Sequence, residues 1–342
     1  MTFAEAIKEA TSKLMNTYPN MHIFGLGASY PNGLDGTMGN IAVEHPERVH
    51  DTPCSEAAVT GMAMGAAISG IRSLVHHGRV EFALFAADPL LTQAAKWAYS
   101  FGNYPVPLTV RIALGRQWGN GPQHTINAKG LFAVPGLKVV CPSTPQAAYG
   151  LLLSAVEDNN PVIYLEPRWA YKLKEYIVDS RMSLDRARVM KSGKDITVVA
   201  VGDTVIDVLK AAEMLKEFVD VEVVDLVSVY PIDRTTIIDS IRNTRRLLVC
   251  ESSTYEYSTA SQILSIVGSV AGIGSAGILA CQDYACPTAP SLTKDYYPTP
   301  KSIANKILIM CGRSHRIENE ETFAQLNLPP TDNVTDLLYR LK

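Results

Sequence analysis

A single acidic residue, Glu56, stands at the start of a long run of small and apolar residues. The segment reads Asp51-Thr52-Pro53-Cys54-Ser55-Glu56-Ala57-Ala58-Val59-Thr60-Gly61-Met62-Ala63-Met64-Gly65-Ala66-Ala67. Pro53 disfavours helical backbone just before it, so we expect a helix with Ser55 as its N-cap and Glu56 in its first turn. Gly61 and Gly65 share one face, although glycine costs a helix up to about 1 kcal/mol relative to alanine. The pattern predicts that another group approaches this helix closely, while these residues alone favour a capped core helix.

His124 follows a glycine-rich loop, Gly115 to Gln123, which comes after a predicted buried strand. Ligands of parallel α/β sheets gather at the carboxyl ends of strands, and histidine changes charge near neutral pH. His124 is therefore a candidate catalytic residue. Cys54 is a candidate nucleophile only if a base such as His124 lies close to it. Spacing alone favours a surface loop with an incidental histidine.

Two further segments carry residues that bind metals or phosphates in other proteins. His76 and His77, with Glu81 and Asp88 nearby, could suggest metal ligands. Adjacent strand residues point in opposite directions, so we expect one buried and one exposed histidine and no shared metal. Gly202-Asp203-Thr204 could begin a phosphate-binding helix, but an ordinary strand-to-helix turn is favoured. Neither G-x-G-x-x-G nor G-x-x-x-x-G-K-[ST] occurs.

Strand and helix patterns alternate along the chain, which predicts an α/β fold with mostly parallel sheets covered on both faces. Predicted strands span 21–26, 73–77, 107–113, 137–141, 161–165, 196–201, 221–226, 246–250 and 277–281. Predicted helices, besides the one at Glu56, span 2–18, 88–99, 145–157, 204–217, 233–243, 258–267 and 300–310. The looser, more charged stretch 171–193 suggests a linker. We therefore expect two doubly wound domains, 1–185 and 186–342, with a polar surface tail after Gly312.

Composition excludes several classes of protein. The 342 residues include 31 Lys and Arg against 34 Asp and Glu, a net charge of -3, which offers no case for nucleic acid or an anionic membrane. The six cysteines form no C-x-x-C pair, so neither zinc ligation nor a disulfide framework is supported. The N-terminus lacks a signal-peptide pattern, and the apolar run 57–71 is shorter than the roughly 20 residues that span a bilayer. We expect a soluble, cytoplasmic protein.

An ordered set of short motifs resembles a known family over nearly the whole chain. In the first half these are Asp51-Thr52-Pro53-x-Ser55-Glu56, Gly61-x-x-x-Gly65-Ala66-Ala67, Ala94-Ala95-Lys96, Gln123-His124, Pro135-Gly136-Leu137-Lys138-Val139-Val140, Pro142-Ser143-Thr144-Pro145 and Asp158-Asn159-Asn160-Pro161-Val162. The second half adds Val224-Asp225-Leu226, Tyr230-Pro231-Ile232-Asp233 and Arg245-Arg246-Leu247-Leu248-Val249. Together they resemble the β subunit of the thiamine-diphosphate-dependent, decarboxylating component of 2-oxo acid dehydrogenases (the pyruvate, branched-chain and acetoin types). That family lies within the transketolase superfamily.

The resemblance implies a pyrimidine-binding domain followed by a transketolase C-terminal domain. It places Glu56 against N1′ of the cofactor aminopyrimidine, with Phe82 packed on that ring, Cys54 touching the cofactor and His124 facing the substrate. To hydrogen-bond N1′, Glu56 must hold a proton, so its pKa should be raised by burial.

The resemblance also implies metal sites and a partner. Backbone carbonyls of Leu108, Ala155, Asp158 and Asn160 match a structural potassium site in some members. The pyrophosphate and its Mg²⁺ need a Gly-Asp-Gly motif, which this chain lacks. An α subunit would supply it, giving an α2β2 assembly that is inactive without α and that could serve a lipoyl acyltransferase.

Departures from the family pattern keep an alternative open. Leu26 follows Gly25 where a glutamate is common, and Asp88-Pro89 replaces Asp-Gln. Ser252 to Tyr257 replaces a glycine-rich turn, and His76-His77-Gly78-Arg79-Val80 replaces a more apolar, acidic segment. The polar segment could suit a hydroxylated or phosphorylated substrate. The alternative is thus a split transketolase-like or carboligating enzyme that moves a two-carbon unit to an aldehyde. A non-catalytic assembly partner is a third hypothesis, which the presence of Glu56, Phe82 and His124 disfavours.

Overall fold

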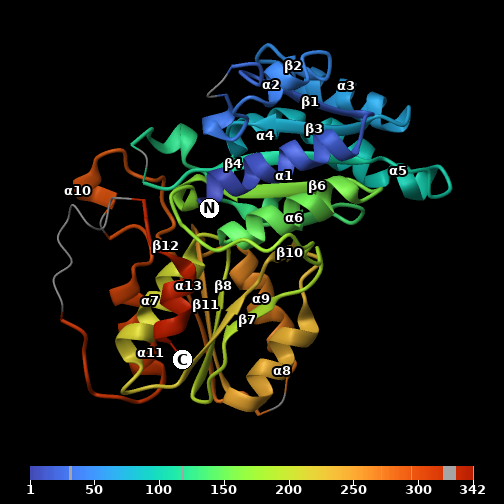
Figure 1. Ribbon diagram of the computed structural model, residues 1–342. Coiled ribbons are helices and arrows are strands. Elements are labelled where there is room, and N and C mark those ends of the chain that lie inside the picture. The colour runs from blue at the N-terminus through green and yellow to red at the C-terminus, as the bar shows by residue number, and fades with distance from the viewer. Residues whose placement is uncertain (31–32, 118, 271, 294, 319–328, 342) are drawn as a thin grey trace. The chain divides into compact units, whose positions relative to one another are not determined.

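The computed structural model describes residues 1–30, 33–117, 119–270, 272–293, 295–318 and 329–341. The chain forms two compact units (Figure 1). Unit 1 comprises Met1–Leu114 and Leu131–Leu184, and unit 2 comprises Gly115–Gly130 and Asp185–Lys342. The sequence suggests a division near residue 185, but nothing in it indicates that the loop 115–130 belongs with the second unit.

Unit 1 is a parallel sheet with helices packed against it (Figure 1). Its strands lie in the order β5-β6-β4-β3-β1-β2. The strands are β1 Met21–Gly25, β2 Val49–Asp51, β3 Arg72–His77, β4 Leu108–Leu114, β5 Lys138–Val140 and β6 Val162–Pro167. The helices are α1 Phe3–Thr17, α2 Ile41–Glu44, α3 Glu56–Ile68, α4 Val80–Ala83, α5 Ala95–Ser100 and α6 Pro145–Glu157. Short 3-10 turns span Leu34–Gly36, Leu84–Ala86, Lys129–Phe132 and Arg168–Ala170, and a π-helical segment spans Asp88–Ala94.

Local sequence explains where these helices begin. Thr2 and Glu5 form a capping box at the start of α1, and Thr144 accepts a hydrogen bond from Ala147 at the start of α6. Ser55 precedes α3 as predicted, but its side chain makes no capping hydrogen bond. The predicted helix 88–99 is a π-helical segment continued by α5.

The expectation for the paired histidines is wrong, because both are buried. His76 is 5% exposed and His77 is 4% exposed. They lie at the end of β3, which pairs with β1 on one side and β4 on the other. A central strand of a parallel sheet is covered on both faces, so alternation along it does not bring one histidine to the solvent. Among the described residues no group of His, Cys, Asp and Glu could hold a metal ion.

Unit 2 contains a sheet ordered β12-β11-β8-β9-β7, parallel except for the antiparallel edge strand β7. The strands of this part of the chain are β7 Arg188–Lys191, β8 Ile196–Ala200, β9 Val221–Asp225, β10 Ser228–Tyr230, β11 Arg246–Thr254 and β12 Ser275–Cys281. The helices are α7 Thr204–Leu215, α8 Arg234–Thr244, α9 Thr259–Val267, α10 Pro290–Thr293, α11 Pro300–Met310 and α13 Val334–Arg340, and a 3-10 turn, η4, spans Pro122–His124.

Two segments of unit 2 hold structure that the sequence patterns do not predict. The expected linker 171–193 contains β7, whose short, charged pattern resembles a loop. The expected polar tail contains α13, where Val334 and Leu337 are buried and Arg340 pairs with Glu213. Part of that tail, 319–328, lies outside the described residues. No helix in the described part of the chain has the length and apolar character needed to cross a membrane.

Candidate active site

Glu56 begins α3, directly after the segment that leaves the carboxyl end of β2. The Asp51 carboxylate accepts hydrogen bonds from the backbone N–H of Gly27 at 2.6 Å and from the Ser29 hydroxyl at 3.2 Å. It also accepts from the N–H of Thr52 at 3.0 Å. Asp51 therefore holds the loop after β1 against the segment that leads into α3, in which the Glu56 side chain is partly exposed. The sequence patterns do not reveal this role of Asp51.

The face of α3 that bears the glycines is open in unit 1. Met62 is 52% exposed, and Gly65 is exposed as well. A Cβ atom added at Gly61 or Gly65 would meet no atom within 4 Å. The two helical glycines predict that another group packs closely against α3. Within unit 1 no group does so at Gly61 or Gly65.

The opposite face of α3 is fixed by a buried hydrogen bond. The Thr60 hydroxyl lies one turn after Glu56 and contacts Nε2 of His77 at 2.9 Å. Burial, reinforced by the neighbouring His76, lowers the pKa of His77 to about 3. His77 is thus a neutral hydrogen-bonding group that ties α3 to β3.

A buried ion cluster lies at the ends of β3, β4 and β6. The Glu166 carboxylate accepts hydrogen bonds from Nε and Nη2 of Arg111, both at 3.0 Å, from Nε2 of His76 at 3.1 Å and from the Tyr171 hydroxyl at 2.9 Å. Arg111 also donates to Thr37 at 2.8 Å. Burial alone would raise the pKa of Glu166, but Arg111 and His76 bring it down to about 2. Because the ionised Glu166 gives His76 a hydrogen-bonding partner, the polar side chain of His76 can be buried.

Phe82 and Cys54 also belong to unit 1. Phe82 lies in α4, and the guanidinium carbon of Arg79 sits 5.4 Å from the centroid of its ring. This contact is a cation–π interaction, in which the Arg79 guanidinium lies over the ring of Phe82. Cys54 is an exposed free thiol two residues before Glu56. The structure therefore places Cys54, Glu56 and Phe82 in one unit.

The four predicted potassium ligands surround the start of β4 and the end of α6. The carbonyl of Ala155 accepts a hydrogen bond from the Thr109 hydroxyl at 2.9 Å, next to Leu108. The carbonyl of Asp158 accepts from Arg72 at 3.1 Å, and the N–H of Asn160 donates to the Asp158 carboxylate at 2.8 Å. The carbonyls of Ala155 and Asp158 thus each accept one side-chain hydrogen bond, which leaves each of them a second lone pair.

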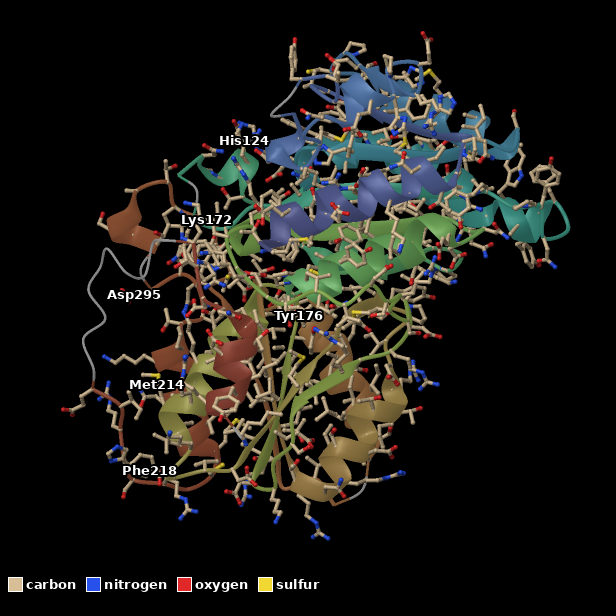
Figure 2. The ribbon with its side chains drawn as sticks, viewed as in Figure 1. His124, Lys172, Tyr176, Met214, Phe218 and Asp295 are labelled. Atoms are coloured by element: carbon tan, nitrogen blue, oxygen red, sulfur yellow. The ribbon has the colours of Figure 1, made fainter. Side chains whose placement is uncertain are left out.

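His124 ends the turn η4 and belongs to unit 2, unlike the other candidates (Figure 2). Its side chain is half-buried. The turn opens at Gly121, whose φ of 77° is in the left-handed region that favours glycine. Thr125, directly after His124, donates its hydroxyl to the Gly121 carbonyl. The turn that carries His124 is therefore closed by a hydrogen bond within the loop itself.

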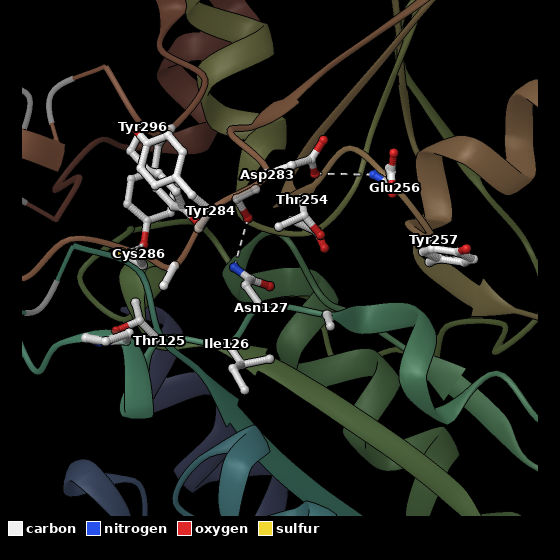
Figure 3. Close-up of a pocket in the computed structure, with 16 residues that line it drawn as sticks. Thr125, Ile126, Asn127, Thr254, Glu256, Tyr257, Asp283, Tyr284, Cys286 and Tyr296 are labelled. Carbon is white, nitrogen blue, oxygen red and sulfur yellow. Dashed lines mark hydrogen bonds between the residues drawn. The ribbon is translucent and has the colours of Figure 1, made fainter.

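Unit 2 also holds a cavity of about 510 Å³ beside this loop (Figure 3). Its wall comes from the loop, from the end of β11 and the segment after it, from the segment after β12 and from the segment before α11. The lining residues are Pro122, Thr125, Ile126, Asn127, Ala128, Ser252, Ser253, Thr254, Glu256, Tyr257, Asp283, Tyr284, Ala285, Cys286, Tyr296 and Tyr297. The rings of Tyr284 and Tyr296 lie 5.4 Å apart, and Asp283 accepts the backbone N–H of Tyr255 at 2.8 Å. No sequence pattern indicates this cavity.

Comparisons with known proteins agree with this two-part fold. The family model for the transketolase pyrimidine-binding domain matches residues 1–174, and that for the transketolase C-terminal domain matches residues 185–303. A solved structure described as a split gene transketolase, inactive beta4 tetramer, superimposes with a TM-score of 0.77 at 20% identity, covering 92% of this chain and 99% of that one. The fold is thus that of transketolase-type proteins.

Sequence relatives narrow the class. The chain is 36% identical over 333 residues to the β subunit of acetoin:2,6-dichlorophenolindophenol oxidoreductase of Bacillus subtilis, covering 91% of this chain and 97% of the relative. It is 33% identical over 317 residues to the protein of that name in Cupriavidus necator, covering 87% and 94%. It is 34% identical over 274 residues to the β subunit of the pyruvate dehydrogenase E1 component of Acholeplasma laidlawii, covering 78% and 84%. The chain belongs to the family of transketolase-type β subunits of thiamine-diphosphate-dependent 2-oxo acid dehydrogenases.

Proposed function

We propose that this chain is the β subunit of a thiamine-diphosphate-dependent enzyme that decarboxylates a 2-oxo acid and transfers the resulting acyl group. The observation that carries the proposal is the position of Glu56. It is an acid in the first turn of α3, shortly after the carboxyl end of the parallel strand β2, in a chain about a third identical to such β subunits. The carboxyl ends of parallel strands are where α/β sheets bind ligands.

The residues of unit 1 fit the pyrimidine half of the cofactor. Glu56 would hold a proton towards the ring nitrogen N1′, Phe82 would pack on the ring, and Cys54 would contact it. The open Gly61–Gly65 face leaves room for a close neighbour. Thiamine diphosphate, when bound, supplies the electron sink for decarboxylation. His124 would face the substrate as a hydrogen-bond donor or proton carrier.

A partner follows from what the chain lacks. With no Gly-Asp-Gly motif, it has no group of the kind that holds the pyrophosphate and Mg²⁺ in this family. We propose that an α subunit supplies that motif, in an α2β2 assembly that can serve a lipoyl acyltransferase. The exposed face of α3 offers a surface of small residues against which a partner can pack closely.

The activity is tested by producing the chain together with an α subunit of this family that carries Gly-Asp-Gly, sought first in the neighbouring reading frame. We expect the pair to reduce 2,6-dichlorophenolindophenol when given pyruvate, branched-chain 2-oxo acids or acetoin, and each subunit alone to be inactive. The Arg79 guanidinium next to Phe82 favours testing the alternative, a transketolase-like transferase, in parallel. Ketol formation from a ketose and an aldehyde, without reduction of the dye, would replace our proposal with that alternative.

We also propose that potassium binds the carbonyls of Leu108, Ala155, Asp158 and Asn160. An ion that binds only the folded state stabilises it by mass action. We expect the melting temperature of the chain to be about 2–4 °C higher in KCl than in NaCl of equal ionic strength. About 1 kcal/mol of added stability raises the melting temperature of a domain of this size by that amount. Equal melting temperatures in the two salts would contradict the potassium site.

A further inference from the structure

The loop 115–130 leaves unit 1 after Leu114, yet it belongs to unit 2. Two cations, one near each end of the loop, are buried in unit 2 and pair with its acidic side chains. Arg116 is 5% exposed and Lys129 is fully buried. A charge is buried in a protein only when it is paired and hydrogen-bonded, because desolvation costs several kcal/mol. These two residues therefore fix both ends of the loop.

At the first end, Arg116 makes contacts with two segments. One of its terminal nitrogens donates to Asp203 at 3.0 Å and to Asp207 at 2.7 Å, and the other donates to the carbonyl of Pro298 at 3.2 Å. Its guanidinium carbon lies 5.4 Å from the centroid of the Tyr297 ring. The start of the loop is thus held against the start of α7 and the segment before α11.

At the second end, Lys129 is enclosed by side chains from β11 and the loop itself. Its ammonium donates to Asn127 at 2.8 Å and to Ser252 at 3.2 Å, and it lies 3.6 Å from Asp203 and 4.0 Å from Glu251. Asn127 in turn donates to Ser252 at 2.9 Å (Figure 3). The end of the loop is therefore held against the end of β11.

One carboxylate joins the two ends. Asp203 pairs with Arg116 through Oδ2 and accepts the Ser252 hydroxyl through Oδ1 at 2.6 Å. Burial would raise the pKa of Asp203, but the charges of Lys129 and Arg116 hold it below its ordinary value. Asp203 is therefore an ionised carboxylate that links Arg116 to Lys129. The strand-to-helix turn Gly202-Asp203-Thr204 places this carboxylate between the two cations.

Between the anchors the backbone turns sharply. Gln117, Gly119 and Gly121 have φ values of 52°, 75° and 77°, in the left-handed region. A non-glycine residue such as Gln117 adopts that region at an energetic cost, which surrounding contacts must offset. His124 follows this stretch and precedes Asn127, so its position depends on where the two ends are held.

We propose that Arg116 and Lys129, joined through Asp203, are positioning residues for His124. The proposal rests on the role of His124 in the proposed function. A misplacement of about 1 Å of a reacting group can cost about a hundredfold in rate. Loosening either anchor should therefore lower turnover through His124 while leaving the two sheets folded.

The first test is amide hydrogen exchange on Lys129→Met in the reconstituted complex. We expect exchange of the peptide spanning 119–126 to rise about tenfold or more, as for local opening, while β8 and β9 keep their protection. Arg188→Met is the matched control, because it removes an ion pair with Asp225 from the same sheet, 2.8 Å long, away from the loop. Unchanged exchange in 119–126 would overturn the proposal whether or not the complex is active.

The second test is a double-mutant cycle with His124→Ala. We expect Lys129→Met to lower kcat about tenfold or more with KM within about twofold, and to have no further effect in the His124→Ala background. An equal effect in both backgrounds, or a His124→Ala variant with wild-type activity, would overturn the positioning role; only the second outcome also removes His124 from the proposed function. If Lys129→Met fails to fold, Asn127→Ser loosens the same end without leaving a buried charge unpaired, and we expect the same pattern at smaller size.

Discussion

In unit 1 one buried carboxylate, Glu166, receives hydrogen bonds from Arg111, His76 and Tyr171. In unit 2 three buried carboxylates, Asp203, Asp207 and Glu251, share the cations of Arg116 and Lys129. The first cluster has more donors than acids, and the second has more acids than cations. The two clusters should therefore respond differently to charge and pH.

The pKa directions follow this difference. Arg111 and His76 overcome burial and lower the pKa of Glu166 to about 2. In the second cluster the cations lower the pKa of Asp203 alone, while burial raises the pKa of both Asp207 and Glu251 despite the cations beside them. Glu166 therefore adds stability that is complete above its ordinary value near 4.5 and is lost as pH falls towards 2. Glu251 adds stability that is present at acidic pH and is lost as pH rises through its raised pKa.

The largest effect should come from Glu166→Gln. The substitution leaves Arg111 as a buried cation without its carboxylate, and breaking such a pair costs about 3–5 kcal/mol. We expect unit 1 to lose about that free energy of unfolding, measured by hydrogen exchange in β3, β4 and β6. A loss below about 1 kcal/mol would mean that Glu166 is not the ionised centre of its cluster.

A smaller, pH-dependent effect should come from His77→Asn. Because the pKa of His77 is about 3 in the folded state and 6.5 otherwise, the unfolded state takes up a proton first as pH falls. Protonation of His77 in the unfolded state should therefore lower the free energy of unfolding by about 2 kcal/mol between pH 7 and pH 5. This follows from about 1.36 kcal/mol per unit of pKa shift. The variant should lack that part of the pH dependence in urea unfolding, whereas replacing the exposed His315 by Asn should leave it unchanged.

The smallest effect should come from Glu251→Gln, which makes in unit 2 the same chemical change as Glu166→Gln makes in unit 1. Asp203 and Asp207 remain to pair with the two cations, so we expect the free energy of unfolding at pH 7 to stay within about 1 kcal/mol of wild type. Hydrogen exchange in β8 and β11 measures it. A loss as large as that of Glu166→Gln would erase the contrast between the clusters.

The strand and helix order of both units could be predicted because buried parallel strands are continuous apolar runs, such as Leu108–Leu114. The predicted helix at 300–310 matches α11, whose capping box at Thr299 and proline at its first turn are local signals. Local patterns draw attention to Glu56 and His124, whereas Phe82, and the roles of all three toward the cofactor and substrate, come only from the resemblance to the family.

The remaining features depend on contacts between residues far apart in sequence. His76 and Glu166 are 90 residues apart, and Arg116 and Asp207 are 91 apart. An arginine or lysine in a glycine-rich loop has the pattern of a surface residue, so the anchors of the His124 loop could not be predicted. The sequence does not predict the edge strand β7 for a similar reason, because its pairing with β9 decides its structure.

The most direct test of the account is the Glu56→Gln variant in the complex reconstituted with its α subunit. Gln keeps the size of the side chain but cannot release or take up a proton, so we expect decarboxylation to fall by about a hundredfold or more, with assembly of the complex unchanged. The exposed Glu44→Gln change in the same unit is the matched control and should leave the rate unchanged. Activity of Glu56→Gln within a few-fold of wild type would contradict the assignment of Glu56 as the acid that serves the cofactor.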